Sequence, residues 1–93
     1  MSIDNTLAER GSRYGEFINN ASVAQDLKRV MAASSGWGAM DNDQRESLEV
    51  IAQKISRIVT GDPDYVDNWH DIQGYAKLVE DRLRGEGFGD GKA

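Results

Sequence analysis

Two pairs of charged residues at helical spacing are the chain's clearest candidates for ligand chemistry. Lys54 and Arg57 lie three positions apart, so on a helix they can bind a phosphate together or pair with an acid across a helical hairpin. Glu46 and Glu49 have the same spacing and, with Asp71, can supply the carboxylate oxygens that a hard cation such as Mg²⁺ prefers. The alternative for each pair is a solvated helix face without a ligand.

The stretch from residue 60 to 78 joins a tight turn to a helix that carries acids and aromatic rings. Asp71 is the predicted centre of a site there, and Asn68 and Tyr75 recur on the same side of the helix. Near the N-terminus, Arg10, Arg13 and Tyr14 belong to a cationic and aromatic cluster that can pair with and stack on a nucleotide, or Tyr14 can pack to anchor a surface segment. The predicted ligand-binding residues are Arg13, Tyr14, Lys54, Arg57, Asn68, Asp71 and Tyr75, and the predicted metal ligands are Glu46, Glu49 and Asp71.

No residue is identified as catalytic. His70 is the only histidine, which excludes a zinc site built on paired histidines, and a solvent-exposed role is the alternative to acid–base chemistry for it. The sequence has no phosphate-binding or dinucleotide-binding glycine pattern and no serine or cysteine nucleophile with local His and acid partners. Covalent catalysis is therefore not expected.

Apolar periodicity predicts the helices that position these residues. We expect helices at residues 22–32, from an N-cap at Asp41 or Asp43 to residue 60, and from residue 65 or 66 to 84. A short helix at residues 5–10 and an irregular, glycine-broken segment precede them. The stripes predicted to face the core are Val23, Leu27, Val30 and Met31; then Leu48, Ile51, Ala52, Ile55, Ile58 and Val59; and then Trp69, Ile72, Ala76, Val79 and Leu83.

Local signals fix the ends of the last two helices. Gln44 follows Asp41 by three residues and Glu46 follows Asp43 by three, so either pair can form a capping box, while Gly61 and Pro63 end the same helix. The short turn predicts that the next helix runs back antiparallel. Gly74, inside that helix, costs about 1 kcal/mol relative to alanine, which favours a close helix crossing or a ligand at this position.

Length and charge limit the possible classes of protein. Ninety-three residues predict one helical domain at residues 1–84, and the glycine-rich residues 85–93 predict a disordered tail. A net charge of −5 argues against nucleic acid as a partner. The chain has no apolar run long enough to span a membrane and no signal-peptide pattern, and it lacks cysteine, so a cytoplasmic location is expected.

The last helix also predicts self-association. Its second stripe, formed by Asn68, Asp71, Tyr75 and Leu78, lies beside the first, and one neighbouring helix in the same chain cannot cover both. Since a domain of this length has a thin core, we expect a homodimer or tetramer. The predicted fold class is all-α, a short antiparallel helical bundle completed by oligomerisation.

Several segments together resemble a family of small phage and prophage proteins of unassigned function. They are AERG at residues 8–11, YG at 14–15, KISRI at 54–58, and GDP at 61–63 followed by DNWHDIQGYA at 67–76. More distantly, the family is similar to the MazG-type all-α nucleotide pyrophosphohydrolases. Those enzymes hold magnesium with a Glu-x-x-Glu helix and a Glu-x-x-Asp helix, and they assemble from helical hairpins.

The resemblance implies a nucleotide pocket with altered metal ligands. Asp71 matches the Asp of the second motif, Asn68 stands in place of its Glu, and alignment by the turn puts Lys54 and Arg57 near the first pair of acids. The resemblance therefore implies a protein that binds a nucleotide or other phosphate-containing ligand without hydrolysis, as in the sequestration of signalling nucleotides during infection. The alternatives are an active Mg²⁺-dependent pyrophosphohydrolase, using Glu46 and Glu49, and an interaction module without a ligand.

Overall fold

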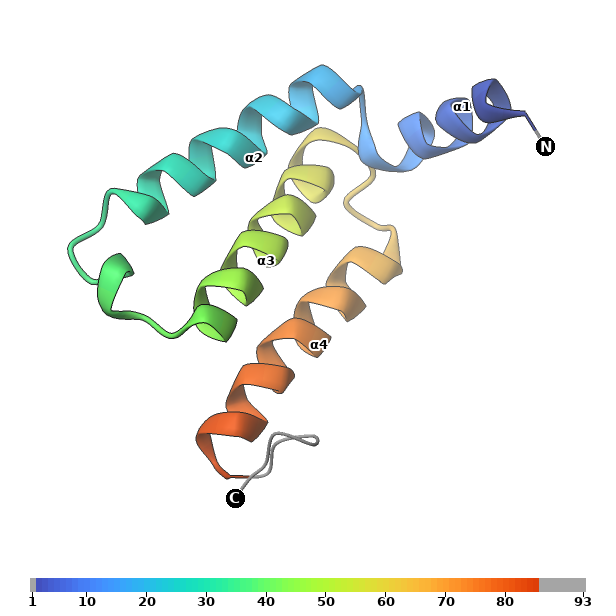
Figure 1. Cartoon of the computed structure of the whole chain (residues 1–93). Helices are drawn as coiled ribbons and strands as arrows, with labels where there is room; N and C mark the ends of the chain where they lie inside the picture. Colours follow the sequence, from blue (N-terminus) through green and yellow to red (C-terminus); the bar gives the residue numbers. More distant parts are fainter. Residues whose placement is uncertain (1, 86–93) are drawn as a thin grey trace.

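The computed structural model describes residues 2–85, which form an all-helical bundle without strands in that range (Figure 1). Its elements are α1 (Ile3–Tyr14), α2 (Phe17–Ala32), the short 3₁₀ helix η1 (Trp37–Ala39), α3 (Asn42–Thr60) and α4 (Val66–Leu83). The predicted all-α class is confirmed. Most of the predicted tail, residues 86–93, lies outside the described residues. None of the described helices is both long and apolar enough to cross a membrane.

The N-terminal third is more helical than the sequence predicted. The α1 helix continues through Gly11, and only residues 15 and 16 separate it from α2, which begins at Phe17. Ser2 caps α1 by accepting a hydrogen bond from the amide of Asn5 at 3.1 Å. A single interior glycine costs about 1 kcal/mol, which twelve helical residues can absorb. The predicted irregular segment is thus reduced to the break at Gly15.

The ends of α3 and α4 agree with the sequence prediction. Asp41 and Gln44 form the capping box, in which the amide of Asp41 donates to Gln44 Oε1 at 2.8 Å. After α3 ends, the carboxylate of Asp62 accepts a hydrogen bond from the amide of Asp64 at 2.9 Å, which tightens the turn. The α3 and α4 helices therefore form the expected antiparallel hairpin (Figure 1).

In the bundle, α3 lies between α2 and α4, and these two outer helices do not pack against each other (Figure 1). Small side chains line both contacts of α3. Ser56 donates to Asn20 Oδ1 of α2 at 2.8 Å, and Ser47 donates to the carbonyl of Tyr75 in α4 at 3.2 Å. The three helices therefore form one layer, with two open faces above and below α3.

The predicted core stripes are only partly buried. In the described chain the buried apolar residues are Ala24, Ala52 and Ile58; Ala52 and Ile58 belong to the stripe predicted on α3, whereas Leu48 and Ile55 of that stripe are each 38% exposed. Because neighbours flank α3 on two sides, several of its large apolar residues project from one face of the layer. On α4, Ile72 and Val79 of the predicted stripe are half-buried and Trp69 and Leu83 are exposed, while Asn68 of the second stripe is buried.

We call this exposed surface the apolar face. A helix turns about 100° per residue, so the contacts of each helix with its neighbour fix the direction of its other side chains. On α3, the side chains opposite Gln53 and Arg57 belong to the apolar face. The large exposed residues of this face are Val30 of α2, Leu48, Ile55 and Val59 of α3, and Trp69 and Leu83 of α4.

Two glycines allow the N-terminal segment to cross the hairpin turn at very short range. A Cβ atom on Gly15 would overlap the backbone carbonyl of Thr60, and one on Gly61 would lie 2.6 Å from Tyr14 Cα. The hydroxyl of Thr60 donates to the carbonyl of Tyr14 at 3.1 Å, and the amide of Asp62 donates to the backbone of α1. This crossing fixes the end of α1 against the end of α3.

An arginine closes the opposite end of the hairpin. Arg82 of α4 donates to Asp41 Oδ2 and to Asp43 Oδ1, both at 2.8 Å. These bonds connect the C-terminal part of α4 to the start of α3. The hydrogen bond from Arg82 lowers the pKa of Asp43 below its usual value.

This contact predicts a pH-dependent stability. The pKa of Asp43 is lower in the folded protein than in the unfolded chain. Ionised Asp43 therefore contributes its full stabilisation at a pH above its unfolded-state pKa, and this stabilisation is lost as the pH falls through its folded-state pKa. We expect Arg82→Gln to destabilise the protein near neutral pH and to differ less from the wild type at acidic pH. Urea denaturation of both proteins at several pH values measures this. Arg84→Gln is the control, because among the described residues Arg84 forms its ion pair with Glu80, four positions earlier in the chain; equal pH profiles for all three proteins would contradict the prediction.

Candidate functional site

The structure separates the predicted cationic pair. Lys54 Nζ lies 3.0 Å from Asp71 Oδ2, and the Lys54 side chain is only 15% exposed. Of the two alternatives for Lys54, the structure thus has the ion pair across the hairpin. Arg57 instead contacts the ring of Tyr14 on α1. Lys54, Arg57 and Asp71 therefore do not converge on a single ligand position.

Asn68 and Tyr75 are the other two residues of α4 that the sequence predicted to bind the ligand. Asn68 is 2% exposed, and its Nδ2 has no hydrogen-bond partner among the described residues. The side chains of Tyr75 and Asp71 line a shallow hollow of about 340 Å³. Gly74 lines the same hollow, and no atom lies within 4 Å of the position where its Cβ would be. The helix crossing that Gly74 suggested is thus not found within the described chain.

The single chain does not assemble the predicted magnesium ligands. Glu46 is exposed on α3, and the carboxylate of Asp71 is paired with Lys54. Among residues 2–85, no group of three or more His, Cys, Asp or Glu side chains is arranged to hold a metal ion. The three-carboxylate set of Glu46, Glu49 and Asp71 is therefore not brought together by this fold.

Arginines and tyrosines cluster where α1 meets the hairpin turn. The guanidinium carbon of Arg57 lies 4.7 Å from the centroid of the Tyr14 ring, and that of Arg10 lies 5.2 Å from it. Tyr14 in turn meets the edge of Tyr65, with centroids 5.9 Å apart. Such cation–π contacts stabilise by about 0.5–2 kcal/mol each and restrict the guanidinium groups to defined positions.

Arg13 belongs to the same cluster, but its guanidinium contacts two residues of the protein, Tyr65 and Glu9. It donates to the hydroxyl of Tyr65 at 2.9 Å and lies 3.3 Å from Glu9. The Tyr65 hydroxyl donates onward to Asp67 at 2.8 Å, and this hydrogen bond raises the pKa of Tyr65. Arg13 therefore joins α1 to Tyr65, the residue that precedes α4, and it does not line the groove described below.

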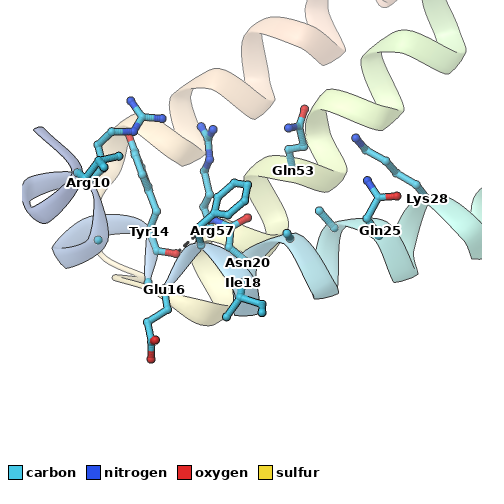
Figure 2. Close-up of a pocket in the computed structure, with 15 residues that line it drawn as sticks. Arg10, Tyr14, Glu16, Ile18, Asn20, Gln25, Lys28, Gln53 and Arg57 are labelled. Carbon is cyan, nitrogen blue, oxygen red and sulfur yellow. Dashed lines mark hydrogen bonds between the residues drawn. The ribbon is translucent and has the colours of Figure 1, made fainter. Parts of the chain in front are cut away.

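A groove of about 540 Å³ lies beside this cluster, between α1, α2 and the end of α3. Figure 2 shows that the nitrogen-bearing ends of Arg10, Arg57, Gln53 and Lys28 point the same way, along one side of the groove. The walls also include the rings of Tyr14 and Phe17 and the side chains of Asn20, Ala24 and Gln25. The volume is within the range of about 300–1,000 Å³ that is usual for small-ligand sites.

The groove is cationic although the whole chain carries a net charge of −5. Arg10, Lys28 and Arg57 line it, and none of them has a carboxylate within ion-pair distance in the part of the chain that the structure describes. The acid among the lining residues, Glu16, points away from these cations (Figure 2). The arrangement favours an anion, because three positive charges line one groove without a carboxylate partner among the described residues.

Of the predicted ligand-binding residues, the groove contains Arg57 and Tyr14. The cluster predicted near the N-terminus included Arg10, although Arg10 was not among the predicted ligand-binding residues. Sequence reasoning missed Lys28 and Gln53. A signal for Gln53 was present, because it precedes Arg57 by four residues and must share its helix face. Lys28 gave no such signal, since its position depends on the register of α2 against α3.

Comparisons of this chain with protein-family models, with curated protein sequences and with solved structures found no match. The fold and the groove are therefore the observations on which a function can be argued.

Proposed function

We propose that this protein binds a nucleotide or a related phosphate-containing small ligand in the groove between α1, α2 and α3. The observation that carries the proposal is that Arg10, Lys28 and Arg57, without carboxylate partners among the described residues, line one groove with an aromatic wall. An anionic ligand would neutralise this charge, and a base could stack on an exposed ring. A phosphate ligand is also what the resemblance to small phage proteins implies. The proposed binding site is the groove, however, whereas the sequence placed the centre of the site at Asp71.

The geometry favours binding over hydrolysis. Arg57 and Arg10 are held against the Tyr14 ring, so little side-chain entropy is lost when they contact a phosphate. The groove's lining includes one carboxylate, Glu16, which points away from the cations (Figure 2). Capture of a nucleotide without cleavage, as in sequestration, is thus the activity that we propose.

Isothermal calorimetry with a panel of nucleotides tests the proposal. We expect Arg57→Gln to weaken nucleotide binding about tenfold or more, because a charge-assisted hydrogen bond contributes roughly 1.5–3 kcal/mol. The matched control is Arg29→Gln, since Arg29 lies on α2 but is paired with Asp26 outside the groove. Absence of binding heat across the panel, or equal loss in both variants, would refute the proposal. Release of pyrophosphate from a triphosphate would instead support the pyrophosphohydrolase alternative.

We also propose that a second copy of the chain covers the apolar face. Helices about 24–28 Å long, set roughly 9 Å apart, give the three-helix layer a face of about 700 Å². Standard interfaces bury about 800 Å² on each partner, so this face is large enough for a stable dimer. With a buried apolar core of Ala24, Ala52 and Ile58, one layer needs a second layer to enclose a larger core.

A further inference from the structure

The cations of the groove lie at two separate places along it. We infer that the groove takes a ligand with two phosphate groups separated by a nucleoside, in preference to one whose phosphates are directly linked. This inference rests on the proposed function and narrows its class of ligand. It follows from the register of α2 against α3, which sets how far Lys28 lies from Arg57.

The hydrogen bond between Ser56 and Asn20 fixes that register. It places the first turns of α2 beside the last turns of α3, and Arg57 is the residue after Ser56. Lys28 lies eight residues beyond Asn20 on α2, so it is about 12 Å further along the helix axis. Arg10, whose guanidinium lies near the Tyr14 ring, is at the same end as Arg57. One end of the groove therefore has two guanidinium groups, and the other has one ammonium group.

Neutral hydrogen-bonding side chains occupy the interval between these ends. Gln53 lies one helical turn before Arg57 on α3 and appears between Arg57 and Lys28 in Figure 2. Gln25 lies one turn before Lys28 on α2 and lines the same stretch. Amide groups can donate to and accept from a sugar or a base, but they do not neutralise a phosphate. The order along the groove is thus guanidinium, amide and ammonium.

This order suits two phosphates that are separated by a nucleoside better than two phosphates that are directly linked. Phosphates joined through a single bridging oxygen lie close together, so to contact both ends of the groove they require Arg57 and Lys28 to extend toward each other. Phosphates on opposite sides of a nucleoside can contact both ends, with the sugar and base beside Gln53. Arg10 and Arg57 can each contact one phosphate through two N–H groups, whereas Lys28 would contact the other phosphate through its single ammonium group.

Two ligands with equal numbers of phosphates provide the test. Calorimetry compares adenosine 3′,5′-bisphosphate with ADP, and AMP is the single-phosphate reference. We expect the bisphosphate to bind at least tenfold more tightly than ADP. Lys28→Gln should weaken the binding of the bisphosphate more than it weakens the binding of AMP, whereas Arg57→Gln should weaken the binding of all three. Arg29→Gln, next to Lys28 in sequence, should match the wild type, and far-ultraviolet circular dichroism checks that each variant is folded.

The outcomes separate this inference from the proposed function. If AMP and ADP bind but the bisphosphate binds no more tightly than ADP, the inference fails and the proposed function stands. An equal effect of Lys28→Gln on AMP and on the bisphosphate also overturns the inference, because it places all the phosphates at one end. If none of the three ligands binds, both fail.

Discussion

Replacing Gly15 with alanine is expected to lower the free energy of unfolding by about 3 kcal/mol or more, enough to prevent stable folding in a marginal domain. The new methyl group would occupy the space of the Thr60 carbonyl, which is backbone and cannot rotate away. Gly15 also has a φ of 80°, a left-handed conformation that alanine adopts only with strain. Both effects disrupt the crossing that holds α1 against the hairpin turn.

Thermal and urea unfolding followed by circular dichroism measure this effect, and the chain contains matched controls. Gly61→Ala should be similarly destabilising, since its Cβ would meet the backbone of Tyr14. Gly11→Ala and Gly74→Ala should each stabilise by up to about 1 kcal/mol, because both positions are helical and have no atom within 4 Å of the added Cβ. A wild-type melting temperature for Gly15→Ala would show that the crossing is not formed.

The second large effect concerns assembly. We expect Ile55→Asp to convert a dimer into a monomer, because Ile55 lies near the middle of α3 on the apolar face and a buried, unpaired carboxylate costs several kcal/mol. Multi-angle light scattering at micromolar concentration, combined with size-exclusion chromatography, measures the change in mass. If the dimer is obligate, the variant will also lose helicity at low concentration, since dissociation and unfolding are then coupled.

Two controls add the same charge elsewhere. Leu78→Asp places it on the opposite side of the layer, near Asp71, and Ser22→Asp places it at the outer edge of α2. Neither should change the mass if the apolar face is the interface. Dissociation by Leu78→Asp alone would return the interface to the stripe first predicted from the sequence. A monomeric wild type would refute the assembly proposal.

The sequence predicted α3 and α4 because their signals are local. A capping box at Asp41, the pair Gly61 and Pro63, and apolar residues at helical period act within a few residues of the positions that they determine. The beginning of α2 was missed because it lacks such a local signal: Glu16 precedes the helix and forms no side-chain capping bond. Local chemistry therefore determined where these helices occur wherever a cap or a breaker was present.

The tertiary structure decided which side of each helix packs against which neighbouring helix. Lys54 and Arg57 are three residues apart, so they point about 60° from each other around α3. Since α3 lies between two helices, this angle is enough to turn Lys54 toward Asp71 of α4 and Arg57 toward Tyr14 of α1. Apolar periodicity identified a stripe on α3 but could not tell a buried interior from the open face of a single layer. The groove depends on the crossing at Gly15 and on the register between Ser56 and Asn20, both of which are contacts between residues distant in sequence.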